Sequence, residues 1–81
     1  MAEYSVITPL PGTFYRRATP DSPPYVEIGA QVTADTVIGL IEVMKQFSEL
    51  TAGVAGRVGA FMVDDGDPVE PGQTVATLEC Q

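Results

Sequence analysis

The side chain best suited to carry chemistry in this sequence is Lys45, the only lysine among 81 residues. A lysine amine is a nucleophile on a flexible four-carbon stem, but it is protonated at neutral pH. Acylation of Lys45 would therefore need an activated acyl donor and an enzyme that removes the proton. The alternative is a solvated lysine paired with Glu42 or Glu49, which would be neighbours on a helix. The residue is thus either a modification site or a surface charge.

Composition excludes most other chemistry. The sequence has no histidine and one cysteine, Cys80, so catalytic triads, imidazole bases and Cys-rich metal sites are ruled out. Asp64, Asp65 and Asp67 lack the full calcium-loop pattern, so we expect no metal site. Four basic residues against 11 acidic ones give a formal charge of −7, which argues against binding to nucleic acid or anionic membranes. No apolar run reaches the ~20 residues of a membrane helix.

These exclusions also bound the role and location of the chain. Nothing in the sequence could run a reaction alone, so we expect that it is not an enzyme by itself. A single cysteine forms no internal disulfide, and a reducing compartment, the cytoplasm, is therefore the expected location.

Short strands and turns are the elements predicted to position Lys45. Eight glycines and seven prolines interrupt the chain, and the segments between them are rich in β-branched and aromatic residues. Glu70-Pro71-Gly72-Gln73 predicts a type II turn, because proline suits its second position and glycine its third. Residues 63–67 predict another polar turn. A chain this short buries only a small core, so a single domain is expected.

The segment 40–52 allows two interpretations. Its apolar residues recur at helical spacing, which favours a helix. An internal repeat favours strands instead, because residues 26–42 align without gaps on residues 63–79. The identical pairs are Val26 and Val63, Gly29 and Gly66, Val32 and Val69, and Glu42 and Glu79. The second copy ends in the β-branched segment TVATLE, so its counterpart Ile38–Val43 is predicted to be a strand.

The repeat predicts two similar β halves packed face to face. Strands Ile38–Val43 and Phe47–Thr51 would then be joined by a tight hairpin, Val43-Met44-Lys45-Gln46. This arrangement places Lys45 at the tip of the hairpin, where its amine would be accessible.

The residues around Lys45 resemble a known family. Glu42-Val43-Met44-Lys45 is similar to the Glu-Ala-Met-Lys-Met attachment motif of biotinyl domains, with Val43 and Gln46 in place of the usual Ala and Met. Flanking segments match as well, at Pro9–Arg16, Ala55–Val58 and Asp65–Val69. The resemblance runs from about Val6 to Glu79 and identifies the chain as a member of the biotin carboxyl carrier family of the acetyl-CoA carboxylase type.

The resemblance implies a fold. It is an all-β flattened barrel or sandwich of two quasi-symmetric antiparallel halves, a barrel-sandwich hybrid. The chain would form one biotinyl domain over residues 1–81, with a core of about 6–79. A thumb-like loop of about residues 17–24 would cover biotin, and its named positions are Thr19, Pro20, Asp21, Ser22 and Pro23. The alternative is an ordinary Pro-rich surface loop, and Arg16, Arg17 and Arg57 are expected to be solvated.

The resemblance also implies a function. Lys45 would carry biotin as N6-biotinyllysine, with Glu42, Val43, Met44 and Gln46 recognised by biotin protein ligase. The carrier would move carboxybiotin from biotin carboxylase to carboxyltransferase, in lipid and fatty acid biosynthesis. The alternatives are a lipoyl-type carrier, disfavoured because lipoyl domains usually have Asp-Lys-Ala at the attachment site, and an unmodified β-sandwich adaptor.

Overall fold

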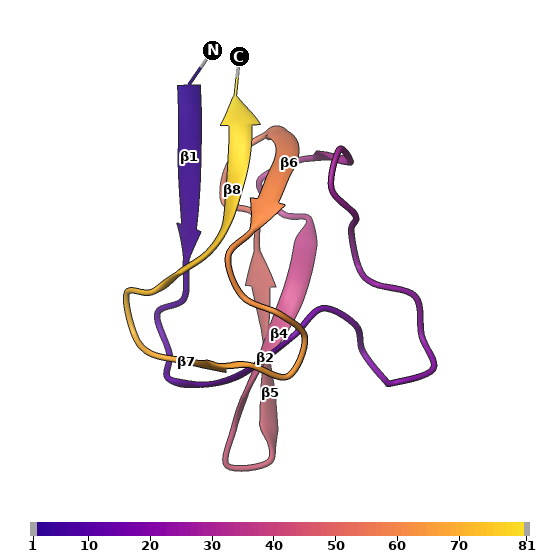
Figure 1. The fold of residues 1–81 in the computed structure, drawn as a ribbon, viewed down its shortest axis with the longest axis vertical. Helices are drawn as coiled ribbons and strands as arrows, with labels where there is room; N and C mark the ends of the chain where they lie inside the picture. The colour runs from indigo at the N-terminus through magenta and orange to yellow at the C-terminus, as the bar shows by residue number, and fades with distance from the viewer. Residues whose placement is uncertain (1, 81) are drawn as a thin grey trace.

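The structure is a computed structural model that describes residues 2–80, and these residues form strands and turns without a helix (Figure 1). The strands are β1 (Ala2–Ile7), β2 (Gly12–Tyr15), β3 (Gln31–Val32), β4 (Val37–Val43), β5 (Gln46–Thr51), β6 (Gly56–Phe61), β7 (Pro68–Val69) and β8 (Thr74–Cys80). The predicted strand Ile38–Val43 is confirmed by β4, and the helical interpretation of residues 40–52 is wrong. Pairing of β4 with β2 and β5 outweighs the helical spacing of apolar residues in this segment.

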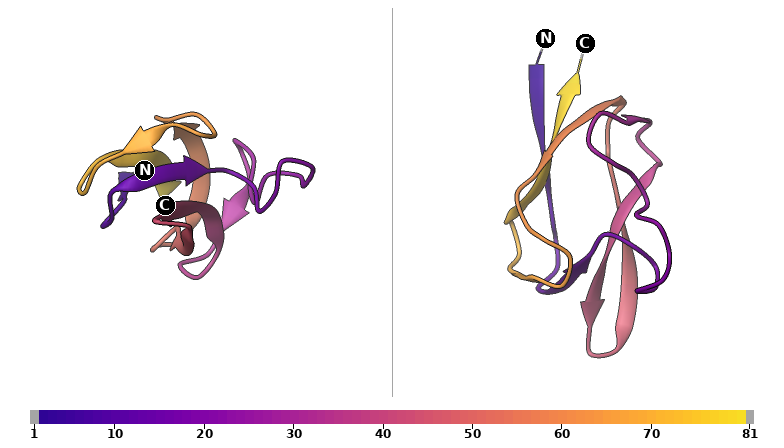
Figure 2. Two further views of the ribbon diagram at one scale, coloured as in Figure 1. Left: turned by 90° about the horizontal axis from the view of Figure 1, so that it is seen from below. Right: turned by 45° about the vertical axis from the view of Figure 1, so that its right-hand side comes forward.

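Two antiparallel four-stranded sheets form a flattened sandwich of 37 × 27 × 19 Å. One sheet has the order β1-β8-β6-β3 and the other has the order β5-β4-β2-β7. Figure 2 shows the two layers from below and from the side. The all-β, two-layer fold predicted from the sequence is confirmed.

The two halves repeat each other's backbone pairing. Strands β3 and β4 lie 37 positions before β7 and β8, the offset of the sequence repeat. The hydrogen bonds match as well: Gly29 donates its N–H to the Val58 carbonyl at 2.7 Å, and Gly66 donates to the Phe14 carbonyl at 2.7 Å. The repeat therefore reflects two quasi-symmetric units, and each buries its apolar face only against the other.

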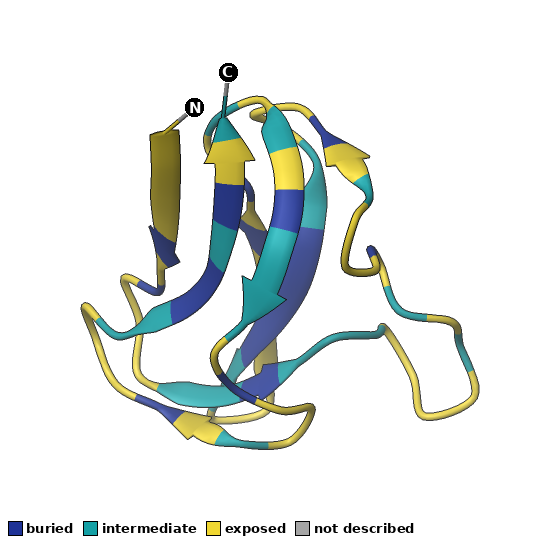
Figure 3. Ribbon diagram, turned by 45° about the horizontal axis from the view of Figure 1, so that its top comes forward, coloured by how far each residue is buried: buried dark blue, intermediate teal, exposed yellow. Residues whose placement is uncertain are grey.

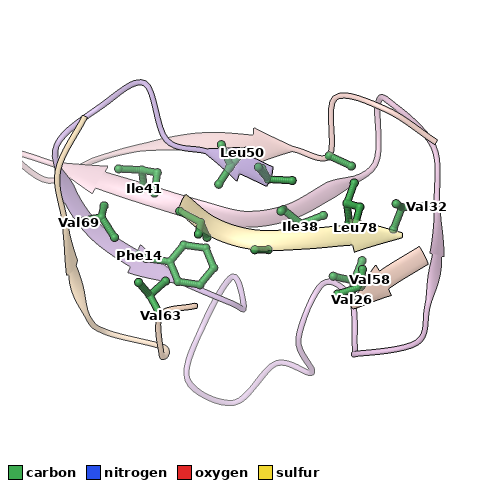
Figure 4. Packing of buried hydrophobic residues seen from close by; sticks show 14 residues of the cluster. Phe14, Val26, Val32, Ile38, Ile41, Leu50, Val58, Val63, Val69 and Leu78 are labelled. Carbon is green, nitrogen blue, oxygen red and sulfur yellow. The ribbon is translucent and has the colours of Figure 1, made fainter. Parts of the chain in front are cut away.

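The core lies between the two sheets. Its largest fully buried side chains include Phe14 and Ile41 from one sheet and Leu78 and Val58 from the other, and all point into the space between the layers (Figure 4). Alternation along β2 explains the outer surface, because a buried Phe14 directs the next residue, Tyr15, away from the core. The outer face of β2 therefore carries side chains, such as Tyr15, that do not belong to the core.

Predicted turns occur where expected. The Gln73 N–H donates to the Glu70 carbonyl at 3.0 Å, and Gly72 between them has φ of +83°, as a type II turn requires. In the 63–67 turn, the Asp67 N–H donates to the Asp64 carbonyl at 3.0 Å. Both predicted turns are confirmed.

Candidate functional site

Lys45 lies at the tip of the β4–β5 hairpin, at the opposite end of the molecule from the chain termini (Figure 1). Val43 pairs with Gln46, so the loop consists of Met44 and Lys45 alone. Their φ angles are +52° and +67°, the pattern of a type I′ turn. The predicted position of Lys45 is confirmed, and its side chain is exposed.

The two tip residues are unusual for this turn. Type I′ turns favour Asn-Gly, because both central residues have positive φ. A non-glycine residue in this region costs on the order of 1 kcal/mol. Met44 is also 92% exposed, so it gains nothing from burial. The stability of the hairpin therefore does not explain Met44-Lys45.

Glu42 is held by the sheet rather than by Lys45. Its carboxylate accepts a hydrogen bond from the Tyr15 hydroxyl at 3.0 Å. This bond, with desolvation and the negative charges of Glu42 and Asp65, raises the pKa of Tyr15 above its usual value. Phe47 pairs with Glu42 across the strands and packs against Tyr15, with ring centroids 6.3 Å apart. An ordered acidic and aromatic surface thus adjoins the lysine.

A pocket of about 260 Å³ separates this surface from the loop 17–24, which we call the thumb. It is lined by Tyr15, Arg17, Ala18, Thr19, Pro20, Phe47 and Asp65. The thumb extends from the body of the sandwich and is largely exposed (Figure 3). A side view places it beside the β4–β5 hairpin (Figure 2, right).

The structure separates the thumb positions named from the sequence. Thr19 and Pro20 line the pocket, whereas Ser22 closes the loop on itself, with its hydroxyl 2.7 Å from that of Thr19. Asp21 and Pro23 are exposed and are not among the lining residues. Tyr15 and Phe47 also line the pocket, and the sequence analysis did not name them as site residues. The outward position of an aromatic residue next to buried Phe14 was the signal that could have found Tyr15.

The thumb is an insertion into one half of the repeat. Tyr15 and Ala60 occupy equivalent positions, because they pair with Leu40 and Thr77, which are 37 positions apart. Eleven positions separate Tyr15 from Val26, but only three separate Ala60 from its counterpart Val63. The first half therefore has eight additional residues, the length of the segment 17–24.

Arg16 holds the base of the thumb. Its carbonyl accepts the Tyr25 N–H at 2.9 Å, and its own N–H donates to Asp65 Oδ1 at 2.8 Å. The guanidinium lies 4.2 Å from the centroid of the Phe61 ring and donates to the Val26 carbonyl at 3.4 Å. The expectation of solvated side chains is therefore wrong for Arg16, which lies over Phe61. It is also wrong for the half-buried Arg17, whose Nη1 donates to the Ser22 carbonyl at 3.3 Å. Arg57 is exposed as expected.

Arg16→Gln is expected to lower the unfolding free energy by about 1 kcal/mol, because it removes the cation–π contact. For a domain of this size that corresponds to a fall in Tm of roughly 4–8 °C. Thermal unfolding followed by circular dichroism measures it. Arg57→Gln, at an exposed position on β6, is the matched control and should shift Tm by less than about 3 °C. Equal shifts in the two variants would show that Arg16 contributes only as a surface charge.

Residues 2–80 were also searched for metal-ligand clusters and for membrane-spanning helices. No group of three or more His, Cys, Asp or Glu side chains in this part of the chain is arranged to hold a metal ion. Over the same residues, no helix has the length and apolarity to cross a membrane.

The pocket has both polar and apolar walls. Its walls include two aromatic side chains, and Arg17 contributes a buried Nε that has no hydrogen-bond partner among the described residues. The exposed amine of Lys45 lies two residues from Phe47 of the pocket wall.

Comparison with known proteins places these features in a family. The family model described as "Biotin-requiring enzyme" matches residues 5–78. The biotin carboxyl carrier protein of acetyl-CoA carboxylase from Chlamydia muridarum is 45% identical over 67 residues, which are 83% of this chain and 41% of that protein. The protein of the same name from Pseudomonas aeruginosa is 37% identical over 73 residues, 90% of this chain and 47% of that protein. The chain thus spans less than half the length of these relatives.

A solved structure supports the fold alone. Urea carboxylase from Kluyveromyces lactis matches 98% of this chain with a TM-score of 0.80 and 24% identity, over 6% of that much longer chain. The family match covers nearly the whole chain and includes the hairpin that presents Lys45. By the extent of this match and the fold that accompanies it, the chain belongs to the biotin/lipoyl attachment family of biotin-requiring enzymes.

Proposed function

We propose that this chain is a biotin carrier whose Lys45 amine takes biotin in an amide bond. The observation that supports this most directly is the presentation of the only lysine on a two-residue hairpin tip, in a backbone conformation that costs stability. A tip of this kind gives a modifying enzyme access to the amine from several sides. Residues 1–81 would form a single biotinyl domain.

The chain serves, in this proposal, an acetyl-CoA carboxylase, the enzyme named for the relatives at 32–45% identity. Biotin, when bound, supplies a ureido nitrogen that can accept and donate a carboxyl group. The protein residues supply no acid, base or metal; they position the attached group. Tethering raises its local concentration at two enzymes in turn, biotin carboxylase and carboxyltransferase. The expected cytoplasmic location is part of this proposal.

Each site residue has a distinct part in the proposal. Lys45 is the attachment point, and Met44 and Gln46 are exposed beside it for contact with biotin protein ligase. Glu42 and Val43 are half-buried and act mainly by holding the hairpin, Glu42 through its hydrogen bond to Tyr15. The thumb encloses the attached ring on one side.

Intact mass after incubation with biotin, ATP and a biotin protein ligase tests the proposal. We expect one biotinyl adduct, and isoelectric focusing should show the formal charge move from −7 to −8, because amide formation removes one basic group. An unmodified chain beside a carrier that the same ligase modifies would contradict it. A lipoyl adduct formed with a lipoate ligase instead would favour the lipoyl-type carrier, and no adduct with either would favour the adaptor.

Met44→Asn is expected to separate folding from recognition. Asparagine tolerates positive φ, so Tm should rise by a few degrees. The rate constant for biotinylation, kcat/KM, should fall about tenfold or more, because burial of the exposed Met44 side chain against a ligase contributes ~2 kcal/mol. Met44→Leu keeps an apolar side chain and should retain a rate within about threefold of the parent. A rate for Met44→Asn equal to that of Met44→Leu would rule out this contact.

A further inference from the structure

Met44 is the most exposed of the large apolar side chains in the part of the chain that the structure describes. It is 92% exposed, whereas Met62, the other methionine among residues 2–80, is 53% exposed. The two-residue tip accounts for the difference, because both of its residues have positive φ and the β4–β5 hairpin projects beyond the body of the sandwich (Figure 1). Solvent therefore reaches the Met44 side chain from nearly all directions.

Met62 is held closer to the sandwich. Its N–H donates to the carbonyl of Val75, a fully buried residue of β8, at 2.7 Å. About half of the Met62 side chain is consequently covered. The chain thus contains its own comparison, a methionine of lower exposure in the same solvent.

The exposed thioether of Met44 can react with a peroxide. Its sulfur lone pair attacks one peroxide oxygen, and the S–O bond forms as the O–O bond breaks. The transferred oxygen gives its proton to the leaving oxygen, which departs as water or an alcohol. Sulfur loses two electrons and the peroxide gains them, so the product is methionine sulfoxide.

Oxidation of Met44 would change the surface next to the attachment amine. The β4–β5 hairpin contains one sulfur atom, because Gln46 stands on the other side of Lys45. A single oxidation therefore converts all the thioether surface of the tip into a polar sulfoxide. Burying a polar group against a partner without a hydrogen-bond donor is unfavourable. The Lys45 amine and the formal charge of the chain are unchanged.

The fold gives no reason to expect wider damage. Met44 belongs neither to the hydrophobic core nor to the lining of the thumb pocket. Its sulfoxide would remain in solvent in the free chain. Oxidation at this position should therefore act on recognition by another protein and leave folding alone.

We propose that Met44 is a site of reversible oxidation, and that its sulfoxide slows the attachment of biotin to Lys45. This inference rests on the proposed function of Lys45. A peroxide supplies the oxygen. A methionine sulfoxide reductase removes it as water while two thiols are oxidised to a disulfide. Attachment of biotin thereby becomes sensitive to oxidants through a residue that is not itself modified by the ligase.

The test compares two variants in a Cys80→Ser background, because the free Cys80 thiol would also consume peroxide. Met62→Leu keeps Met44 as the oxidisable methionine of residues 2–80, and Met44→Leu keeps Met62. Each chain is treated with hydrogen peroxide, which is removed before biotin, ATP and a biotin protein ligase are added. Peptide mapping by mass measures the sulfoxide at each position, and intact mass measures the biotinyl adduct.

We expect Met44 to be oxidised about twofold faster than Met62 or more, in line with their exposure. Treatment should lower kcat/KM for biotinylation of the Met62→Leu chain about tenfold, and reduction of the sulfoxide should restore the rate. The Met44→Leu chain should be biotinylated at the same rate before and after treatment. Tm should not change in either chain.

The possible failures are distinguishable. Equal biotinylation rates for the Met62→Leu chain before and after oxidation of Met44 would overturn the proposed effect and leave the carrier function standing. An equal fall in the Met44→Leu chain would overturn the assignment to Met44. Oxidation of Met44 no faster than that of Met62 would overturn its selection by exposure. An untreated chain that takes no biotin would contradict the carrier function and the effect on it, while the mapped oxidation rates would still decide whether Met44 is the preferred site.

Discussion

Lys45→Arg is expected to abolish the covalent adduct completely while leaving the fold and Tm unchanged. Arginine keeps the positive charge and the length of the side chain, but its guanidinium does not deprotonate and is a poor nucleophile. The tip is exposed, and no core contact depends on the Lys45 side chain. Intact mass before and after treatment with ligase, biotin and ATP measures the loss.

A composition-matched variant shows whether the tip geometry matters in addition to the amine. The double variant Lys45→Arg, Arg57→Lys exchanges the two residue types and keeps the formal charge at −7. Its lysine is exposed but lies on the extended strand β6, where the backbone does not present it on a turn. We expect no adduct on this variant. Modification of the lysine at position 57 would show that accessibility alone decides the site.

Gly39→Ala is expected to cause a large loss of stability, because position 39 has no room for a side chain. A Cβ atom there would lie 2.5 Å from Phe14 Cε1 and 2.8 Å from the Tyr15 carbonyl oxygen. Phe14 is fully buried, so it cannot move without displacing the core. Overpacking of this kind costs about 1–3 kcal/mol, or a fall in Tm of roughly 5–20 °C.

Gly59→Ala is the matched control for this prediction. Gly59 lies on β6 and, like Gly39, is beside an irregularity of strand register. A Cβ atom at position 59 would meet nothing closer than Thr77 Oγ1 at 3.4 Å. Its Tm should change by less than about 5 °C, since alanine also loses less entropy than glycine on folding. Urea unfolding of both variants compares them, and an equal loss of stability would refute the clash with Phe14.

The thumb pocket depends on the close contact between β2 and β4 that Gly39→Ala probes. Gly39 allows β4 to approach Phe14 and Tyr15, and Tyr15 in turn bonds Glu42 and lines the pocket. A variant that separates β2 from β4 should therefore weaken the pocket as well as the core. The hairpin tip, by contrast, projects beyond the core and can change without this effect.

Patterns within short stretches were enough to predict the fold and the tip. The repeat of residues 26–42 at 63–79 predicted the two halves, because each position in one half must satisfy the same pairing as its counterpart. It also resolved the ambiguous segment 40–52 in favour of strands, from which the position of Lys45 followed. The motif around Lys45 indicated the family, because the attachment motif is contiguous in the chain.

The pocket could not be predicted in this way. Tyr15, Phe47 and Asp65 come from β2, β5 and the turn after β6, and no local pattern relates them. Their meeting depends on how the eight-residue thumb folds over the sheet, and on Arg16, which joins the thumb to Phe61 and Asp65. The burial of Arg16 and Arg17 was missed for the same reason.

By itself, then, the amino-acid sequence determined the strands, their two-fold repeat and the exposed lysine at the turn between β4 and β5. Each of these depends on backbone conformation and on the alternation of apolar residues along a strand, which neighbouring residues set. Only the tertiary structure decided which residues from distant segments line the pocket beside the thumb. Side chains distant in the sequence share a pocket only after the core has packed and the two sheets have fixed their separation.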